Sequence, residues 1–341
     1  MKKTLYTISV IAAAMFAVSC ESGITPDGEG TVSESAAVFK PVLSSNAVSV
    51  ETKASELVSE DGGITIPLSC TVSDGISGNQ VLTKGEQKNT TGEVGALENY
   101  VTEFYVAGWK GAGTFIPAYQ KVVKRDGVFQ TATEYSWPAA SVATFYGYAN
   151  LPSTGVSVGA TADSQILTYT AVPDNAGDQN DILLGFFRGK GRFDETLLRG
   201  GIADMTFFHP LTAVRFKMGT FSGAASVTVK SITMEGVYDS GEATMQPASA
   251  TATTAPVTWD CSDSGTKTVT LANGDTGWTV TSGNIIGEPF ILIPRDFTSS
   301  AVKIKVIASL DGGSDVTLTA AIEAVWEAGK THTYTLGYTL P

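Results

Sequence analysis

The sequence offers few side chains for acid–base or nucleophilic chemistry, because it has only two histidines among 341 residues. His209 has Asp204 upstream, which supplies two members of a Ser-His-Asp triad, but no Gly-x-Ser-x-Gly elbow accompanies them. Glu51 and Glu56 are acids of the kind that glycosidases pair. Such pairs arise by chance in a chain with 34 acidic residues. We therefore expect no enzyme activity, and a packing role for His209.

The oxygen-rich segment 173–181 suggests a calcium site, but its acids do not alternate toward a terminal Glu as in an EF-hand. A turn that leads into a strand is the favoured interpretation. Cys70 and Cys261 are the only cysteines after Cys20, and their spacing is not of the zinc type. We expect both to be small buried apolar residues, with a disulfide between them as the alternative. No metal or cofactor is predicted.

The sharpest chemical signal is the thiol of Cys20. A basic start, an apolar run over 8–18 and the small residue Ser19 precede it, as in a cleavable secretory signal. The run is too short to span a bilayer. The sequence at 17–20 is similar to a bacterial lipobox, whose cysteine receives fatty acyl chains such as palmitate and becomes the mature N-terminus. Several acyl chains anchor a protein stably, so we expect an exported lipoprotein tethered to the outer membrane.

Composition indicates an all-β globular protein. Hydrophobic residues make up 43% of the chain and charged residues only 16%, which suits a core-forming chain. Thr, Ser, Gly and Val are abundant and no long helix-forming run occurs, which favours strands and turns. The formal net charge of −12 disfavours nucleic-acid partners.

Strand-like runs separated by turn clusters divide the chain into a signal peptide at 1–20, a flexible tether at 21–37 and domains at 38–200 and 201–341. The alternation from Ile64 to Cys70 predicts a strand, which Pro67 marks as an edge strand because proline cannot donate to a ladder. Between Ser226 and Met234 the apolar parity slips, which predicts a bulge or bend.

Several segments, in this order and spacing, carry a resemblance. They are Val50-Glu51-Thr52-Lys53-Ala54, Tyr135-Ser136-Trp137-Pro138, Thr144-Phe145-Tyr146-Gly147-Tyr148-Ala149, Asp181-Ile182-Leu183-Leu184, Phe208-His209-Pro210-Leu211-Thr212-Ala213-Val214-Arg215-Phe216, Ile291-Leu292-Ile293-Pro294 and Trp326-Glu327-Ala328-Gly329-Lys330-Thr331-His332-Thr333-Tyr334. Over nearly the whole mature length the chain resembles the fimbrillin family, the Mfa-like and Fim-type lipoprotein pilus subunits of Gram-negative anaerobes.

The resemblance implies two transthyretin-like β-sandwich domains in tandem, with the His209 segment opening the second. It implies structural roles for the motif residues Trp137, Pro138, Asp181, His209, Trp326, Gly329 and Tyr334. It also implies assembly with other fimbrial subunits by strand exchange: a protease removes the first strand, and a neighbouring subunit fills the groove with its own strand.

Two departures from the family pattern bear on the role of the chain. Little sequence follows the final strand to serve as a donor, which favours a tip or accessory subunit that contributes to adhesion. No arginine precedes Arg125, so only Lys40 or Lys53 could serve as a processing site, and an uncleaved membrane-retained anchor is an alternative.

A further alternative is a surface lipoprotein that binds glycans. Its ligand would stack on exposed tryptophans, and the candidates are Trp109, Trp137, Trp259, Trp278 and Trp326.

Overall fold

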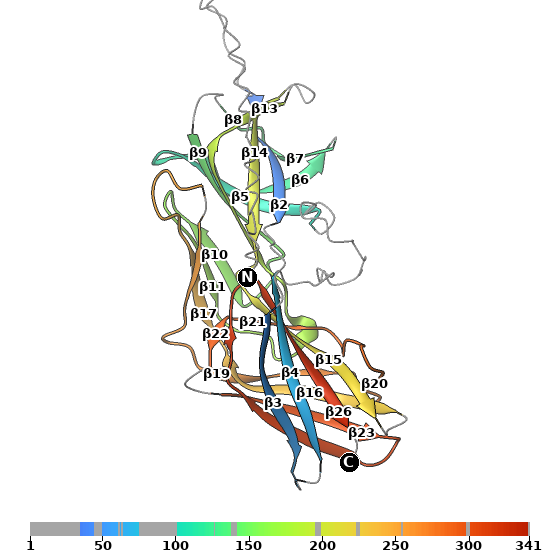
Figure 1. Cartoon of the computed structure of the whole chain (residues 1–341). Coiled ribbons are helices and arrows are strands. Elements are labelled where there is room, and N and C mark those ends of the chain that lie inside the picture. The colour runs from blue at the N-terminus through green and yellow to red at the C-terminus, as the bar shows by residue number, and fades with distance from the viewer. Residues whose placement is uncertain are drawn as a thin grey trace, which may run out of the picture. The chain divides into compact units, whose positions relative to one another are not determined.

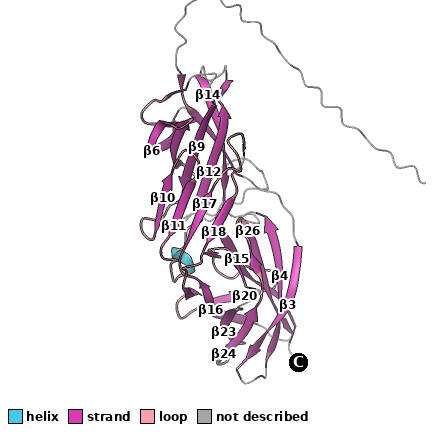
Figure 2. Ribbon diagram, turned by 90° about the vertical axis from the view of Figure 1, so that its left-hand side faces the viewer, coloured by secondary structure: helices cyan, strands magenta, loops and turns pink. Residues whose placement is uncertain are grey.

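A computed structural model describes residues 35–43, 50–60, 62, 64–74, 101–125, 127–137, 142–194, 199–222, 226–253, 255–297 and 301–339 (Figure 1). The predicted signal peptide with Cys20, most of the predicted tether and Pro138 lie outside these residues. Apart from one 3-10 helix, η2 (Ala176–Asp178), the regular elements of the described chain are strands (Figure 2). The all-β prediction is therefore confirmed.

An eight-stranded sheet surrounds a core rich in phenylalanine. Its strands are, in spatial order, β12 (Leu183–Lys190), β9 (Val142–Ala149), β5 (Glu103–Lys110), β6 (Gly113–Arg125), β7 (Val128–Thr131), β2 (Val38–Leu43), β14 (Arg199–Phe208) and β13 (Arg192–Asp194). Because β12 also pairs with β14, this sheet closes on itself. The alternation of buried and less buried residues along β9 places Ala143 and Phe145 in the enclosed core.

A ten-stranded sheet forms the second large layer. It consists of β19 (Thr266–Ala272), β16 (Val227–Tyr238), β23 (Val302–Leu310), β24 (Asp315–Ile322), β3 (Val50–Ser59), β4 (Thr65–Asp74), β26 (Lys330–Thr339), β15 (Thr212–Ser222) and β21 (Phe290–Leu292), with β20 (Trp278–Val280) paired to β16. The N–H of Met218 in β15 donates to the carbonyl of Asn284, and the N–H of Ile286 donates to the carbonyl of Phe216 in β15. Since β20 pairs with β16, the segment from β20 to Ile286 connects β15 with β16.

Three smaller sheets complete the fold. The largest is antiparallel and runs β10 (Val156–Ala160), β11 (Gln165–Tyr169), β17 (Gly241–Met245) and β18 (Val257–Asp260). The others pair β1 (Ser35–Ala36) with β8 (Ser136–Trp137), and β22 (Arg295–Asp296) with β25 (Val325–Trp326).

Strands from both sides of residue 200 share sheets. In Figure 1, β4, coloured blue, lies beside the red β26, and the two pair from Leu68 to Asp74, with the blue β3 on the other side of β4. The strand β11 pairs with β17, and β2 pairs with β14. Division into domains at 38–200 and 201–341 therefore stays a prediction.

The expectation that Pro67 marks an edge strand is wrong. Its strand, β4, lies inside the ten-stranded sheet between β3 and β26. Proline is tolerated there because the register with β26 ends at Leu68, so no ladder partner on that side requires an N–H from position 67.

The predicted irregularity between Ser226 and Met234 is confirmed. The register of β16 against β23 shifts between Val229 and Ser231, which leaves Lys230 as the extra residue of a bulge. One inserted residue reverses side-chain parity. The four apolar residues Val227, Val229, Ile232 and Met234 are consequently all buried.

We predict that packing around Gly185 tolerates no side chain. A Cβ at this position would lie 2.8 Å from the Phe207 ring, which is packed in the core of the eight-stranded sheet. Gly185→Ala should lower the free energy of unfolding by about 1–3 kcal/mol, measured by urea denaturation. The control is Gly159→Ala, where a Cβ meets no atom within 4 Å. An equal loss for both variants would contradict the prediction.

Candidate functional site

The first long strand, β2, occupies a slot in the eight-stranded sheet. It pairs in parallel with β14 from Ile202 to Phe207, and with β7 only at Phe39 opposite Phe129. The β-branched and aromatic residues of Val38-Phe39-Lys40-Pro41-Val42-Leu43 favour an extended backbone. One side of the strand therefore carries a full ladder and the other a single pairing.

Phe39 is the side chain that fixes β2 in this slot. It is 2% exposed and makes edge-to-face contacts with Phe104 at 6.0 Å and Phe145 at 5.3 Å between ring centroids. Ala37 is buried in the same core. Aromatic pairs of this geometry add to the stabilisation from buried area. The core of this sheet is consequently incomplete without β2.

The two predicted processing residues lie in strands. Lys40 is exposed in β2, where its backbone stands opposite Asp204 of β14. The backbone of Lys53 lies in β3, within the register shift between Thr52 and Ser55. A protease binds the segment that it cuts in an extended conformation, through backbone hydrogen bonds of its own. Cleavage at Lys40 or Lys53 therefore requires the pairing of β2 or β3 with its neighbouring strands to open locally.

Asp181 and His209 form a buried pair that the sequence analysis did not predict. Asp181 Oδ1 lies 2.9 Å from His209 Nδ1, and the side chain of Asp181 is fully buried. Asn150 donates from its side chain to the carbonyl of Asp181 at 3.2 Å. Asp204, the partner considered from sequence, lies on β14 opposite Lys40 instead. The pair ties the entry of β12 to the exit of β14 and supports the packing role expected for His209.

The C-terminal motif residues form a second buried cluster. Trp326 donates from Nε1 to the Tyr334 hydroxyl at 3.0 Å and packs edge-to-face on Phe297 at 4.6 Å. Gly329 has φ of 71°, a conformation that favours glycine, and its N–H donates to the carbonyl of Leu211 at 2.8 Å. These contacts tie β26 to the segment that precedes β15.

The tryptophans give little support to a stacking platform for glycans. Trp137 and Trp326 are each 1% exposed, and Trp137 packs edge-to-face on Phe145 at 5.3 Å. Trp109, Trp259 and Trp278 are half-buried. None of the five is exposed, so the broad open ring faces that this alternative requires are missing.

The predicted disulfide alternative is not formed, because neither Cys70 nor Cys261 takes part in a disulfide. Cys70 is 4% exposed in β4, as expected for a small apolar residue, and Cys261 is half-buried after β18. Within the described ranges no group of three or more His, Cys, Asp or Glu side chains gathers as a metal site. The same residues contain no helix of the length and apolarity that a membrane span requires.

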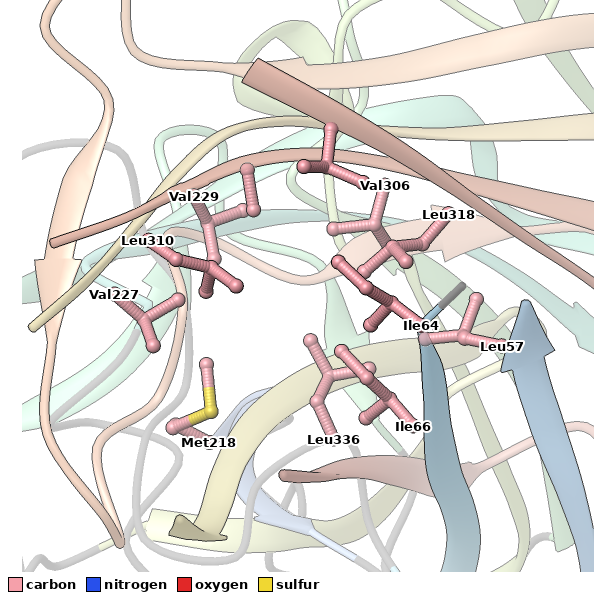
Figure 3. Close-up of a pocket in the computed structure, with 12 residues that line it drawn as sticks. Leu57, Ile64, Ile66, Met218, Val227, Val229, Val306, Leu310, Leu318 and Leu336 are labelled. Carbon is pink, nitrogen blue, oxygen red and sulfur yellow. The ribbon is translucent and has the colours of Figure 1, made fainter. Parts of the chain in front are cut away.

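An apolar cavity lies inside the ten-stranded sheet, between Met218, Leu336 and residues of β16, β23 and β24 (Figure 3). Its volume is about 20 Å³, close to the space of one water molecule. Every lining residue is apolar, so it has no polar group to hold water or to orient a ligand. We interpret it as a packing void.

The model of the fimbrillin-like family matches residues 90–340, which include Asp181, His209, Trp326 and Tyr334. The chain belongs to the fimbrillin-like family. Membership implies a role in fimbriae or cell adhesion at the cell surface, in a family that is not one of enzymes. No curated protein sequence matches the chain.

Solved structures similar to this fimbrillin-like chain come from Bacteroidales. A proposed cell adhesion protein of Bacteroides uniformis is 17% identical, with 70% of this chain and 86% of that chain covered at a TM-score of 0.41. A second from Bacteroides ovatus is 10% identical, with 88% and 91% covered and a TM-score of 0.42. A fimbrial protein of Bacteroides ovatus is 10% identical, with 90% of this chain and 50% of that chain covered at a TM-score of 0.37.

We expect β2 to contribute strongly to stability through Phe39. Phe39→Ala should lower the free energy of unfolding by about 3–5 kcal/mol, because it leaves a cavity among aromatic rings. The neighbouring Lys40→Ala is the control, since Lys40 is exposed and its loss should cost about 0.5 kcal/mol or less. Urea denaturation measures both, and equal small effects would show that β2 does not complete the core.

His332 should make stability depend on pH. It is 2% exposed, its Nε2 has no hydrogen-bond partner among the described residues, and burial lowers its pKa to about 4, with Lys330 adding to the effect. In the unfolded chain the His332 imidazole binds a proton near pH 6.5, whereas in the folded chain it stays neutral until about pH 4. The stability of the folded chain is therefore unaffected by this group above pH 6.5, and it falls as the pH drops from 6.5 toward 4.

The loss in unfolding free energy between pH 7 and pH 4 that this histidine causes should be about 3 kcal/mol. In His332→Gln the loss over the same interval should shrink by that amount, as measured by urea denaturation at both pH values. The comparison concerns the change with pH, so a lower stability of the variant at pH 7 does not affect it. An unchanged acid sensitivity would contradict the assignment.

Proposed function

We propose that this fimbrillin-like chain is a fimbrial subunit that assembles by β-strand exchange, with β2 as the strand that a neighbouring subunit replaces. The slot of β2 is the observation that carries the proposal. A replaceable strand must hold its place by backbone pairing and by side chains that fill pockets at alternate positions. In β2 the full ladder lies on one side only, and Phe39 fills an aromatic pocket.

The alternation of side chains in the β2 region supports this reading. Ala37, Phe39 and Pro41 occupy alternate positions and are buried. On the opposite face Val38 is buried as well, and Lys40 is exposed. An incoming strand that repeats these apolar positions, including that of Val38, would match the slot. Its backbone would run parallel to β14, because β2 does so.

The remaining parts of the proposed role concern location and processing. We place the chain at the outer membrane through acyl chains on Cys20, with cleavage after Lys40 or Lys53 as the step that frees the slot. The role is that of a tip or accessory subunit in adhesion. A membrane-retained anchor is the alternative in which neither lysine is cut.

Strand exchange can be tested with a chain that carries a specific protease site in 44–49, between β2 and β3. After cleavage, a fluorescent peptide with the sequence 35–43 should replace β2 and stay bound during gel filtration. The same peptide with Phe39→Asp should fail, because a carboxylate cannot enter the apolar core without a large penalty. The control peptide with Lys40→Ala should exchange normally.

Failure of the wild-type peptide to enter the cleaved chain would contradict strand exchange at β2. A separate measurement decides between subunit and anchor: the N-terminal residue of the chain recovered from cell surfaces. A start after Lys40 or Lys53 is expected for a processed subunit. A lipid-bearing start at Cys20 in assembled fimbriae would establish the anchor instead.

A further inference from the structure

A cleft of about 490 Å³ lies where the eight-stranded and four-stranded sheets meet. The turn between β5 and β6, the start of β9, the turn between β10 and β11, and the segment 246–250 after β17 line it together with Arg188 of β12. Its volume is within the usual range for small-molecule sites. The cleft does not involve β2 or the apolar cavity of the ten-stranded sheet.

Arg188 is held in one orientation within this cleft. Its Nε donates to Thr144 Oγ1 at 3.0 Å, and its Nη1 donates to the carbonyl of Ser249 at 2.7 Å. The guanidinium also lies over the Phe186 ring, 5.6 Å from the centroid. In the part of the chain that the structure describes, Arg188 has no carboxylate partner. The hydrogen bonds to Thr144 and Ser249 use two of the five N–H donors of the guanidinium. The remaining donors of this planar fork are available to a carboxylate.

Asp163 supplies an acceptor in the same cleft. It is exposed in the turn between β10 and β11, and its backbone N–H donates to Thr161 Oγ1 at 3.3 Å. The side chains of Gln246 and Ser249 add an amide and a hydroxyl to the lining. The cleft thus combines one fixed cation with several groups that bind hydroxyls.

A buried hydroxyl close to these charges also lacks a partner. Tyr146 is fully buried, and its OH makes no hydrogen bond with the described residues. Burial raises its pKa to about 12, while the positive charge of Arg188 opposes the rise and the negative charge of Asp163 adds to it. Tyr146 does not line the cleft, so its hydroxyl lies behind the proposed binding surface and is not part of it.

The lining limits the chemistry of the ligand. No aromatic ring lines the cleft, so a neutral sugar would lack a stacking surface. Asp163 would repel a ligand with several negative charges. We infer that this cleft binds a carboxylated sugar, with its carboxylate on the Arg188 fork and its hydroxyls on Asp163, Gln246 and Ser249. This inference does not depend on strand exchange.

The test uses the full chain and isothermal titration with sodium glucuronate, with glucose as the matched neutral probe and acetate as the carboxylate without hydroxyls. Glucuronate should bind at least about tenfold more tightly than either, because only glucuronate uses both kinds of group. Equal affinity for glucose would overturn the role of charge. Equal affinity for acetate would overturn recognition of a sugar.

Variants assign the binding to Arg188. Arg188→Gln should weaken glucuronate binding at least about tenfold, and Arg188→Lys should weaken it as well, because an ammonium cannot form the bidentate fork. Lys305→Gln on β23 removes the same charge outside the cleft and should leave affinity within about twofold. Circular dichroism checks that each variant folds. If Arg188→Gln does not fold, the affinity of Arg188→Lys for glucuronate tests the assignment instead. Unchanged affinity in the folded Arg188 variant would overturn the assignment.

Discussion

The placement of β2 between β14 and β7 is the constraint on which the eight-stranded sheet depends. Closure of this sheet needs both the direct pairing of β12 with β14 and a strand that bridges β14 to β7. That bridging strand is separated from β14 by more than 150 residues of sequence. It is held by backbone pairing and by Phe39, without a short covalent connection. A strand held in this way can leave only at the cost of opening the core, and in the exchange that we propose an incoming strand would offset this cost.

The short segment His209-Pro210-Leu211 joins the sheets through polar contacts. Asp181 at the entry of β12 pairs with His209, the Trp259 side chain donates to the carbonyl of Pro210, and the Gly329 N–H donates to the carbonyl of Leu211. Three elements that are distant in sequence therefore fix this segment. Buried polar groups that are paired in this way favour one arrangement over others, since every alternative leaves one of them unsatisfied. This gives a structural reason for the motif residues Asp181, His209 and Gly329 at this place.

Of the motif segments, only the one at 144–149 contributes a residue, Thr144, to the lining of the cleft around Arg188. The tryptophans that the sequence offered as a glycan platform are buried or half-buried, and their rings serve the cores. The cleft around Arg188 is instead formed by turns and a strand end that carry no recognisable spacing. Loops on a rigid scaffold are the usual place for binding residues, because their side chains are not needed for packing.

The sequence alone determined the all-β class, the bulge in β16 and the family, because these depend on side-chain periodicity and on ordered local motifs. It misjudged Pro67, since whether a strand lies at an edge depends on neighbours such as β26 that are distant in sequence. Only the tertiary structure paired Asp181 with His209, seated β2 beside β14 and brought Arg188 near Asp163. Contacts between residues that are far apart leave no periodic signal in one sequence, so they become visible only when the strands have paired.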